Sequence, residues 1–243
     1  MAILDEIRRF WDDDAATYDR ARRHHPTDAA VRAAWTAAVE AFLPPPPARV
    51  LDCGAGTGFL SLIAARLGHH VTALDLSSAM LAKLRAAAEV ELLDIEVVEG
   101  PADRPPAGFD AVMERHLLWT LPDPGAALGA WHEAAGGRRL ALVESLWGDA
   151  DPLEARRGAG REWIRRVRGA PDDHHAPYPS GVRQSLPLGS GTHPRSVVEL
   201  VAAAGWANPR LVRLRDVEWA TSLQLALPER VMGVTPRFVV VAG

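Results

Sequence analysis

The stretch that decides the fold of this chain is Val50-Leu51-Asp52-Cys53-Gly54-Ala55-Gly56-Thr57-Gly58, followed by Val71-Thr72-Ala73-Leu74-Asp75. A short apolar run ends in three alternate glycines and leads into an apolar helical segment, 59–67, which Gly68 can terminate. Glycine permits backbone angles that a Cβ forbids, and the first amides of a helix lack partners within it, so a ligand can lie against the main chain there. The order strand, tight turn, helix, strand predicts a nucleotide-binding βαβ unit.

The spacing of the glycines separates this loop from the fingerprint of dinucleotide enzymes. In that fingerprint the third glycine follows the second by three residues, and here Phe59 occupies that position. Asp52 stands two residues before Gly54, where a carboxylate suits a cationic ligand better than a pyrophosphate. At the end of the second strand, Asp75 can accept both hydroxyls of a ribose. The pattern therefore indicates a nucleoside that carries a positive charge, such as S-adenosylmethionine (SAM).

Two further segments extend the pattern to a known family. The sequence from Asp52 to Gly58 resembles motif I of the class I SAM-dependent methyltransferases, and the sequence Asp75-Leu76-Ser77-Ser78-Ala79-Met80-Leu81 resembles their second motif. In that family the acid of the second motif holds the ribose, and the positions of Leu76 and Met80 flank the adenine. The similarity is strong over residues 48–148 and weak over 195–243.

The resemblance implies roles for residues outside these two motifs. Segment 99–103 corresponds to the loop beside the adenine amino group, where Pro101 replaces the usual acid, so the contact falls to Ala102 or Asp103. Segment 109–116 resembles the fourth strand, whose end faces the methionine part of SAM, and segment 11–19 resembles an N-terminal segment whose tyrosine reaches the SAM carboxylate. The implied cofactor-binding residues are Tyr18, Asp52, Gly54, Ala55, Gly56, Asp75, Leu76, Met80, Ala102, Asp103 and Arg115.

Length and periodicity predict one α/β domain. The 243 residues, 48% of them hydrophobic, can bury a single core. Strands are expected near 48–52, 71–75, 95–98, 109–115 and 138–145, with helical patterns between them, which calls for a parallel sheet. The resemblance implies a Rossmann-like seven-stranded sheet in the order 3-2-1-4-5-7-6 with the last strand antiparallel.

Four regions follow along the chain. Residues 1–47 are expected to form an N-terminal helical lid, with helices over 3–11 and 31–42 and Thr27 or Asp28 as the cap of the second. Residues 48–148 form the SAM-binding core. Residues 149–194 break the alternation and are expected to form a substrate cap after the fifth strand. Residues 195–243 are expected to form a helix, 196–204, and a hairpin of two strands, 211–217 and 238–241.

Composition restricts the partners. The net charge of −4 provides no basic surface for nucleic acid. No apolar stretch of membrane-spanning length and no signal-peptide pattern occur, so we expect a cytoplasmic protein without a membrane partner. The run Asp172-Asp173-His174-His175 lacks the spacing of a metal site, and no metal is expected. The oligomeric state stays open, with a homodimer as one option.

Methyl transfer requires alignment of the reactants, exclusion of water and loss of a proton by the acceptor. His116 is the candidate general base because it follows the fourth strand, although a histidine there can equally be structural. Trp11, Trp119 and Trp147 are candidates for the acceptor wall, although large aromatic side chains more often belong to a core.

The acceptor is expected to be a small molecule of natural-product metabolism, such as antibiotic biosynthesis. A group of acids favours N-methylation of a polycationic aminosugar, as in aminoglycosides: Asp12, Asp13, Asp14, Asp149, Asp151, Glu154, Asp172 and Asp173. O-methylation of a polyketide or phenol is the alternative. Two other classes stay open, an NAD(P)-dependent oxidoreductase and a non-catalytic Rossmann-like binding protein.

Overall fold

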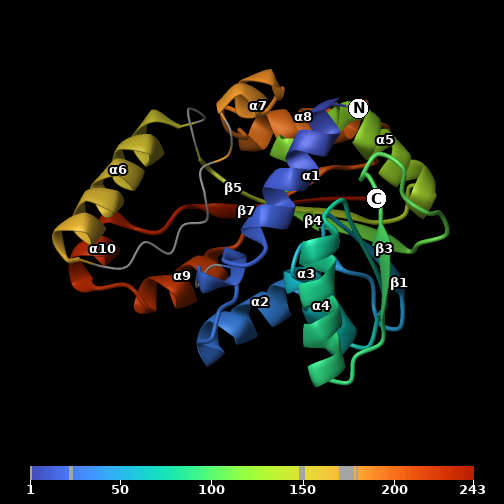
Figure 1. Ribbon diagram of the computed structural model, residues 1–243, viewed down its shortest axis with the longest axis horizontal. Helices are drawn as coiled ribbons and strands as arrows, with labels where there is room; N and C mark the ends of the chain where they lie inside the picture. Colours follow the sequence, from blue (N-terminus) through green and yellow to red (C-terminus); the bar gives the residue numbers. More distant parts are fainter. Residues whose placement is uncertain (1, 22–23, 148–150, 170–177, 179) are drawn as a thin grey trace.

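The structure is a computed structural model that describes residues 2–21, 24–147, 151–169, 178 and 180–243. A seven-stranded sheet in the order β3-β2-β1-β4-β5-β7-β6 runs through its centre (Figure 1). The strands are β1 (Arg49–Cys53), β2 (His70–Asp75), β3 (Ile95–Glu99), β4 (Ala111–Arg115), β5 (Leu140–Ser145), β6 (Arg210–Arg213) and β7 (Arg237–Ala242). The first five pair in parallel, whereas β7 is antiparallel to both β5 and β6. Fold class and strand order are confirmed.

Helices cover both faces of the sheet, as parallel strands buried on two sides require. On one face lie α2 (Ala29–Phe42), α3 (Phe59–Arg66), α4 (Ser78–Val90) and α9 (Arg215–Leu223), where Trp35 and Val39 pack with Val50 and Met113. On the other lie α5 (Pro124–Ala135) and α8 (Pro194–Ala203), whose core includes the fully buried Trp131. The central strands are therefore apolar on both faces, which places polar chemistry at their ends.

The two N-terminal helices form as predicted, but they pack against different parts of the molecule. In α2 the Asp28 side chain caps the helix by accepting the Val31 N–H at 3.0 Å. The apolar face of α2 packs against α3 and α9, so this helix belongs to the core. Only α1 (Ala2–Asp14) lies against α4 and α7 (Ser180–Ser185), with Ile7 in contact with Val182 and Leu186. The lid expected for residues 1–47 stays a prediction, and α2 packs in the core while α1 lies against α4 and α7.

The insertion after β5 divides between two places. Helix α6 (Pro152–Val167) packs against α10 (Leu227–Met232) at one end of the molecule, as Figure 1 shows, whereas α7 reaches α1. Asp149, Asp172, Asp173, His174 and His175 lie outside the described residues. Within the described ranges, none of the helices combines the length and hydropathy needed to cross a bilayer.

The predicted strand over 211–217 was wrong in its second half. β6 ends at Arg213, and α9 begins at Arg215. Val217 and Ala220, three residues apart, are buried on one side of α9 and contact the core under α2. A short alternation of apolar and charged residues fits either period, and packing against α2 selects the helix. The strands β6 and β7 are thus joined through α9 and α10 rather than by a tight hairpin.

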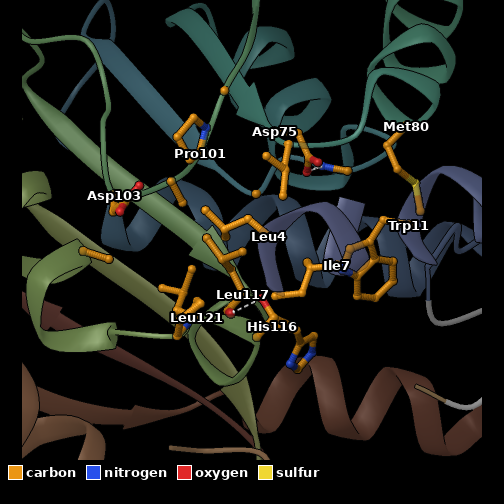
Figure 2. A pocket seen from close by; sticks show the side chains of 18 of the residues that line it. Leu4, Ile7, Trp11, Asp75, Met80, Pro101, Asp103, His116, Leu117 and Leu121 are labelled. Carbon is orange, nitrogen blue, oxygen red and sulfur yellow. Dashed lines mark hydrogen bonds between the residues drawn. The ribbon is translucent and has the colours of Figure 1, made fainter. Parts of the chain in front are cut away.

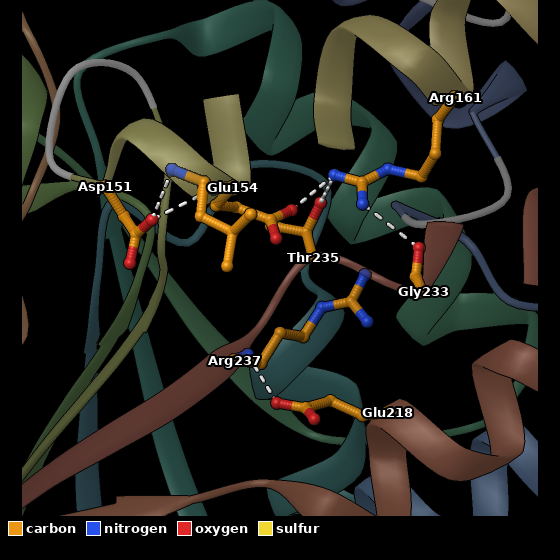
Figure 3. A network of polar contacts seen from close by, with 8 residues as sticks. Asp151, Glu154, Arg161, Glu218, Gly233, Thr235 and Arg237 are labelled. Atoms are coloured by element: carbon orange, nitrogen blue, oxygen red, sulfur yellow. Dashed lines mark hydrogen bonds and ion pairs between the residues drawn. The ribbon is translucent and has the colours of Figure 1, made fainter. Parts of the chain in front are cut away.

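A polar network fastens α6 and α9 to the segment that leads into β7 (Figure 3). Arg161 pairs with Glu154 and donates to the Gly233 carbonyl at 3.0 Å and to Thr235 Oγ1 at 3.1 Å. Asp151 caps α6 by accepting the N–H groups of Leu153 and Glu154. In α9, Glu218 accepts the Arg237 backbone N–H at 2.8 Å. The two bonds of Arg161 hold α6 against the segment that leads into β7.

Replacing Arg161 by Met should lower the free energy of unfolding by about 3 kcal/mol, because the buried Glu154 carboxylate, 6% exposed, loses its partner. Arg166→Met is the matched control on the same helix. The ion pair of Arg166 with Glu162 is solvent-exposed, so this variant should lose no more than about 0.5 kcal/mol of unfolding free energy. Urea denaturation of both variants measures the difference. Equal losses would contradict an anchoring role for Arg161.

Candidate functional site

A cavity of about 310 Å³ opens at the carboxyl ends of β1, β2 and β4 (Figure 2). One wall is helix α1, with Leu4, Ile7 and Trp11. A second wall consists of the glycine loop after β1 and the end of β2, and a third comes from the segment after β4. Parallel strands of an open sheet place ligands at this edge.

The alternate glycines have different tasks in the loop. All three adopt positive φ, +64° at Gly54, +56° at Gly56 and +94° at Gly58. A Cβ at Gly54 would lie 2.7 Å from Leu117 Cδ1, and one at Gly58 would lie 2.7 Å from Leu84 Cγ. At Gly56 a Cβ would meet nothing within 4 Å. Gly54 and Gly58 therefore allow close packing, while Gly56 exposes bare backbone to the cavity.

Asp75 joins the glycine loop to the start of α4. Its Oδ2 accepts the Gly56 N–H and its Oδ1 accepts the Ser77 N–H, each at 2.8 Å. Burial raises the pKa of this carboxyl above its usual range, while the bonds to Ser77 and Gly56 act in the opposite direction. A carboxylate oxygen has more than one acceptor site, so Asp75 can still accept hydroxyls of a ligand.

Side-chain hydrogen bonds tie helix α1 to the start of α4 and the segment after α1 to the glycine loop. Asp12 Oδ1 accepts from Ser77 Oγ at 2.6 Å and from the Ala79 N–H at 3.2 Å. Beyond the helix, Asp19 Oδ1 accepts from Thr57 Oγ1 at 2.7 Å. Of the acidic run that suggested a polycationic acceptor, Asp12 is used in these bonds and Asp14 is buried. The run therefore does not gather charge at the cavity.

Two buried carboxyl groups lie behind the third wall, at the ends of β4 and β5. Glu114 and Glu144 are both fully buried, and Glu114 Oε2 accepts the Leu117 N–H at 2.7 Å. His116 Nδ1 lies 3.4 Å from Glu144 Oε2. Burial raises the pKa of Glu114 to about 8, and burial followed by the neighbouring Glu114 raises the pKa of Glu144 well above its usual range.

His116 itself has the backbone of a constrained residue. Its φ is +60°, a region that few residues other than glycine adopt and that histidine tolerates better than most. Its N–H donates to the Val143 carbonyl at 3.0 Å, which continues the pairing of β4 with β5. The side chain is 28% exposed and lines the cavity. A titratable ring in contact with a buried carboxyl at a cavity wall is a common arrangement of catalytic sites.

Most of the residues singled out by the sequence line this cavity. They are Trp11, Tyr18, Gly54, Gly56, Asp75, Leu76, Met80, Ala102, Asp103, Arg115 and His116. Their individual binding roles stay predictions. The Ala102 carbonyl already accepts the Trp131 indole N–H at 2.7 Å, and the Arg115 guanidinium lies 4.0 Å above the Phe59 ring.

Four singled-out residues lie outside the cavity lining. Asp52 accepts from Ser61 Oγ at 2.5 Å, and burial raises its pKa to about 7. Ala55 donates its N–H to the Leu74 carbonyl at 3.1 Å. Trp119 and Trp147 pack edge to face at 5.2 Å, and Trp119 also packs against Tyr178. In the structure these side chains support the loop and the wall from behind.

Sequence reasoning missed several lining residues and both buried acids. Leu4 and Ile7 lie on the face of α1 that carries the predicted Trp11, and their spacing from it could have marked them as part of the ligand wall. Glu114 and Glu144 interrupt otherwise apolar strands, which is a signal for a buried functional carboxyl. Among the residues that the structure describes, no group of three or more side chains could hold a metal ion.

Comparison with known proteins agrees with this geometry. Residues 51–135 match a family model described as a methyltransferase domain. The ubiquinone biosynthesis O-methyltransferase of Xanthomonas campestris pv. campestris strain B100 is 42% identical over 90 residues, which cover 35% of this chain and 37% of the relative. The chain thus matches little more than a third of the length of this relative.

Solved structures match nearly the whole chain. The magnesium protoporphyrin IX methyltransferase of Synechocystis PCC 6803 with bound SAH covers 97% of both chains, with a TM-score of 0.60 and 15% identity. The geranyl diphosphate C-methyltransferase of Streptomyces coelicolor A3(2), in complex with Mg²⁺, geranyl diphosphate and S-adenosyl-L-homocysteine, covers 100% of this chain and 98% of its own, with a TM-score of 0.61 and 14% identity. At these identities the likeness shows the methyltransferase fold.

The cavity suits SAM by its own residues. Gly56 leaves backbone open where a Cβ would project into free space, and Asp75 offers carboxylate acceptors beside it. Leu76, Met80 and Pro101 contribute apolar surface to the cavity lining, which suits a flat adenine. Tyr18 and Arg115 lie among the lining residues where polar groups of the methionine part can be held.

Asp12→Ala should loosen α1, because the Ser77 hydroxyl and the Ala79 N–H lose their acceptor. Hydrogen exchange of the α1 amides should rise, and the free energy of unfolding should fall by about 1 kcal/mol, as for a lost helix cap. Asp13→Ala changes the exposed neighbouring acid and should leave both quantities unchanged. If the two variants behave alike, α1 is not held by Asp12.

The raised pKa of Glu114 predicts the sign of a pH effect on stability. In the unfolded chain a glutamate titrates at about 4.3, so between that pH and about 8 the folded state holds a proton that the unfolded state has lost. This contribution to stability is complete below the unfolded pKa and is lost as pH rises through the folded pKa.

Glu114→Gln should therefore reduce the loss of unfolding free energy between about pH 6 and about pH 9 relative to the unmodified protein. Urea denaturation at the two pH values measures this difference. Glu133→Gln, which removes an exposed carboxylate, should leave the dependence unchanged. An unaltered slope in Glu114→Gln would mean that Glu114 is ionised in the folded state.

Proposed function

We propose that this protein transfers a methyl group from SAM to a hydroxyl group of a small, largely apolar molecule such as a phenol. The observation that carries the proposal is the position of His116. Its ring lies 3.4 Å from the buried Glu144, in the wall of the cavity that also contains the glycine loop and Asp75. A cofactor cradle and a candidate proton acceptor thus share one cavity.

Each part of the cofactor has a matching group in this cavity. Asp75 accepts the ribose hydroxyls, Leu76 and Met80 pack against the adenine, and the backbone at Gly56 lies along the ligand. Tyr18 and Arg115 bind the methionine carboxylate, for which a guanidinium is well suited. The curated relative named above is an O-methyltransferase, and the Synechocystis structure contains bound SAH, which supports the same assignment.

When bound, SAM supplies an activated methyl group that needs no metal. The residues of the chain then have to orient the acceptor, exclude water and take up its proton. Helix α1 closes the cavity with Leu4, Ile7 and Trp11, which excludes water from the acceptor side. His116 accepts the hydroxyl proton, in the tautomer whose Nδ1–H donates to Glu144 and whose Nε2 is basic. The Glu144 carboxyl, whose burial favours the uncharged form, holds the ring in this orientation through its contact with Nδ1.

The walls favour an apolar hydroxyl acceptor over an aminosugar. Leu4, Ile7, Trp11, Leu117 and Leu121 surround the space beside His116. Three of the acids that suggested an aminosugar bind other groups: Asp12 accepts from Ser77 and Ala79, Asp151 caps α6, and Glu154 pairs with Arg161. A neutral amine needs no base on attack, whereas a hydroxyl does, which gives the His116–Glu144 pair a purpose.

Calorimetry with SAM tests the cofactor assignment. Asp75→Asn removes charge and acceptor capacity at the ribose, and each hydrogen bond to a charged group contributes about 1.5–3 kcal/mol, so affinity should fall about 10-fold to 100-fold. Glu99→Gln removes the carboxylate at the end of the neighbouring strand, opposite Asp75, and should bind SAM normally. Stabilisation by NADH and not by SAM would instead identify an oxidoreductase, and no binding of either would favour a non-catalytic protein.

Methyl transfer to phenols, catechols and aminosugars, followed by mass spectrometry, tests the acceptor class. With a phenolic acceptor, His116→Gln should lower kcat about 10²-fold to 10⁴-fold, as for loss of a general base, with SAM affinity unchanged. Glu144→Gln should lower kcat less, because the imidazole remains. His70→Gln alters an exposed histidine and serves as the control. Methylation of aminosugars alone, at an equal rate in His116→Gln, would refute the hydroxyl assignment.

A further inference from the structure

A second cavity of about 290 Å³ lies beside the glycine loop, between the segment 24–27, α2 and α3. Among the described residues, none lines both this cavity and the first. Thr57 of the glycine loop and Phe59 at the start of α3 form part of its wall. Methyl transfer, as proposed above, uses neither the space nor the charged groups around it.

The floor of the second cavity is aromatic and apolar. Trp35 is 3% exposed, and Leu62 and Ile63 are 6% exposed. The Phe59 ring stands edge to face with Trp35, with centroids 5.0 Å apart. Such a floor can accommodate a flat ring, because aromatic side chains can contact a ring both by stacking and edge to face.

The rim of the second cavity has an excess of positive charge. Among the described residues that line it, Arg32 and Arg66 carry positive charge, against the one acid Glu91. Arg66 neutralises Glu91 through two hydrogen bonds, of 2.6 and 2.5 Å. Arg32 donates to the uncharged Thr27 carbonyl, and in the described part of the chain no carboxylate lies within ion-pair distance of it. Its planar guanidinium fits the two oxygens of a carboxylate.

Side-chain contacts cross the wall between the two cavities. Tyr18 lines the first cavity and stacks at 3.9 Å on His24, which lines the second. Arg115 lines the first cavity and lies 4.0 Å above the Phe59 ring. A ligand that shifts His24 or Phe59 therefore acts on two residues that we assign to the methionine part of SAM.

We propose that the second cavity binds a small aromatic carboxylate, with the ring against Trp35 and Phe59 and the carboxylate paired with Arg32. Binding there changes the affinity of the first cavity for SAM. Binding of the aromatic carboxylate does not depend on the proposed function. Only its effect on SAM affinity rests on that function.

Calorimetry with benzoate tests the site, with benzamide as the uncharged analogue of the same shape. Benzoate should bind saturably, and benzamide at least about tenfold more weakly, because the charge-assisted pair with Arg32 is missing. The substitution Arg32→Gln should lower the affinity for benzoate by a similar factor. Arg210→Gln, at an exposed position on β6, should not. The melting temperature of each variant establishes that it is folded.

Equal affinity of Arg32→Gln and the unmodified protein for benzoate would overturn the proposal, as would the absence of saturable binding. Full displacement of benzoate by SAM would also overturn it, since it would place benzoate in the first cavity. Titration of SAM with and without saturating benzoate should show a change in affinity, with an equal change for benzoate when SAM is present. Benzoate binding in a protein that does not bind SAM would refute the proposed function and the coupling while supporting the site.

Discussion

The carboxylate of Asp75 accepts the backbone N–H groups of Gly56 and Ser77, and the ligand site depends on these two hydrogen bonds. One bond sets the conformation of the glycine loop, and the other sets the start of α4. Ser77 in turn donates to Asp12, so the same connection continues into helix α1. A single half-buried carboxylate thus orients the glycine loop below the cavity and, through one more residue, the helix that covers it.

A second constraint concerns acids at the ends of buried strands. Glu114 and Glu144 lie among fully buried apolar side chains of β4 and β5, where the uncharged form is favoured and the pKa rises. Such groups destabilise a fold when they are ionised without a partner. Their position beneath the bend at His116 and Leu117 gives them a local purpose, because Glu114 holds the Leu117 N–H and Glu144 contacts the His116 ring.

Much of the fold could be predicted because its signals are local. The strand ending at Cys53, the glycine turn and the helix after it each depend on neighbours in sequence, and so does the cap of α2 by Asp28. The second half of the segment 211–217 could not be predicted, since so short a mixture of apolar and charged residues suits a strand or a helix equally. Contact of Val217 and Ala220 with the core under α2 decides that case. The insertion after β5 is similar: the bonds of Arg161 to the segment before β7 place α6, and they join residues more than 70 positions apart.

The sequence by itself determined the nucleotide-binding unit, the type of cofactor and half of the residues that line the cavity, because the turn geometry and the motif spacing are properties of short segments. Only the tertiary structure decided which side chains meet. It turned Asp52 toward Ser61, set Trp119 and Trp147 behind the cavity wall, used Asp12 as a tie between α1 and α4, and brought Glu144 to His116. The physical reason is that these contacts join separate strands and helices, and only the packing of the sheet and its helices brings them within hydrogen-bond distance.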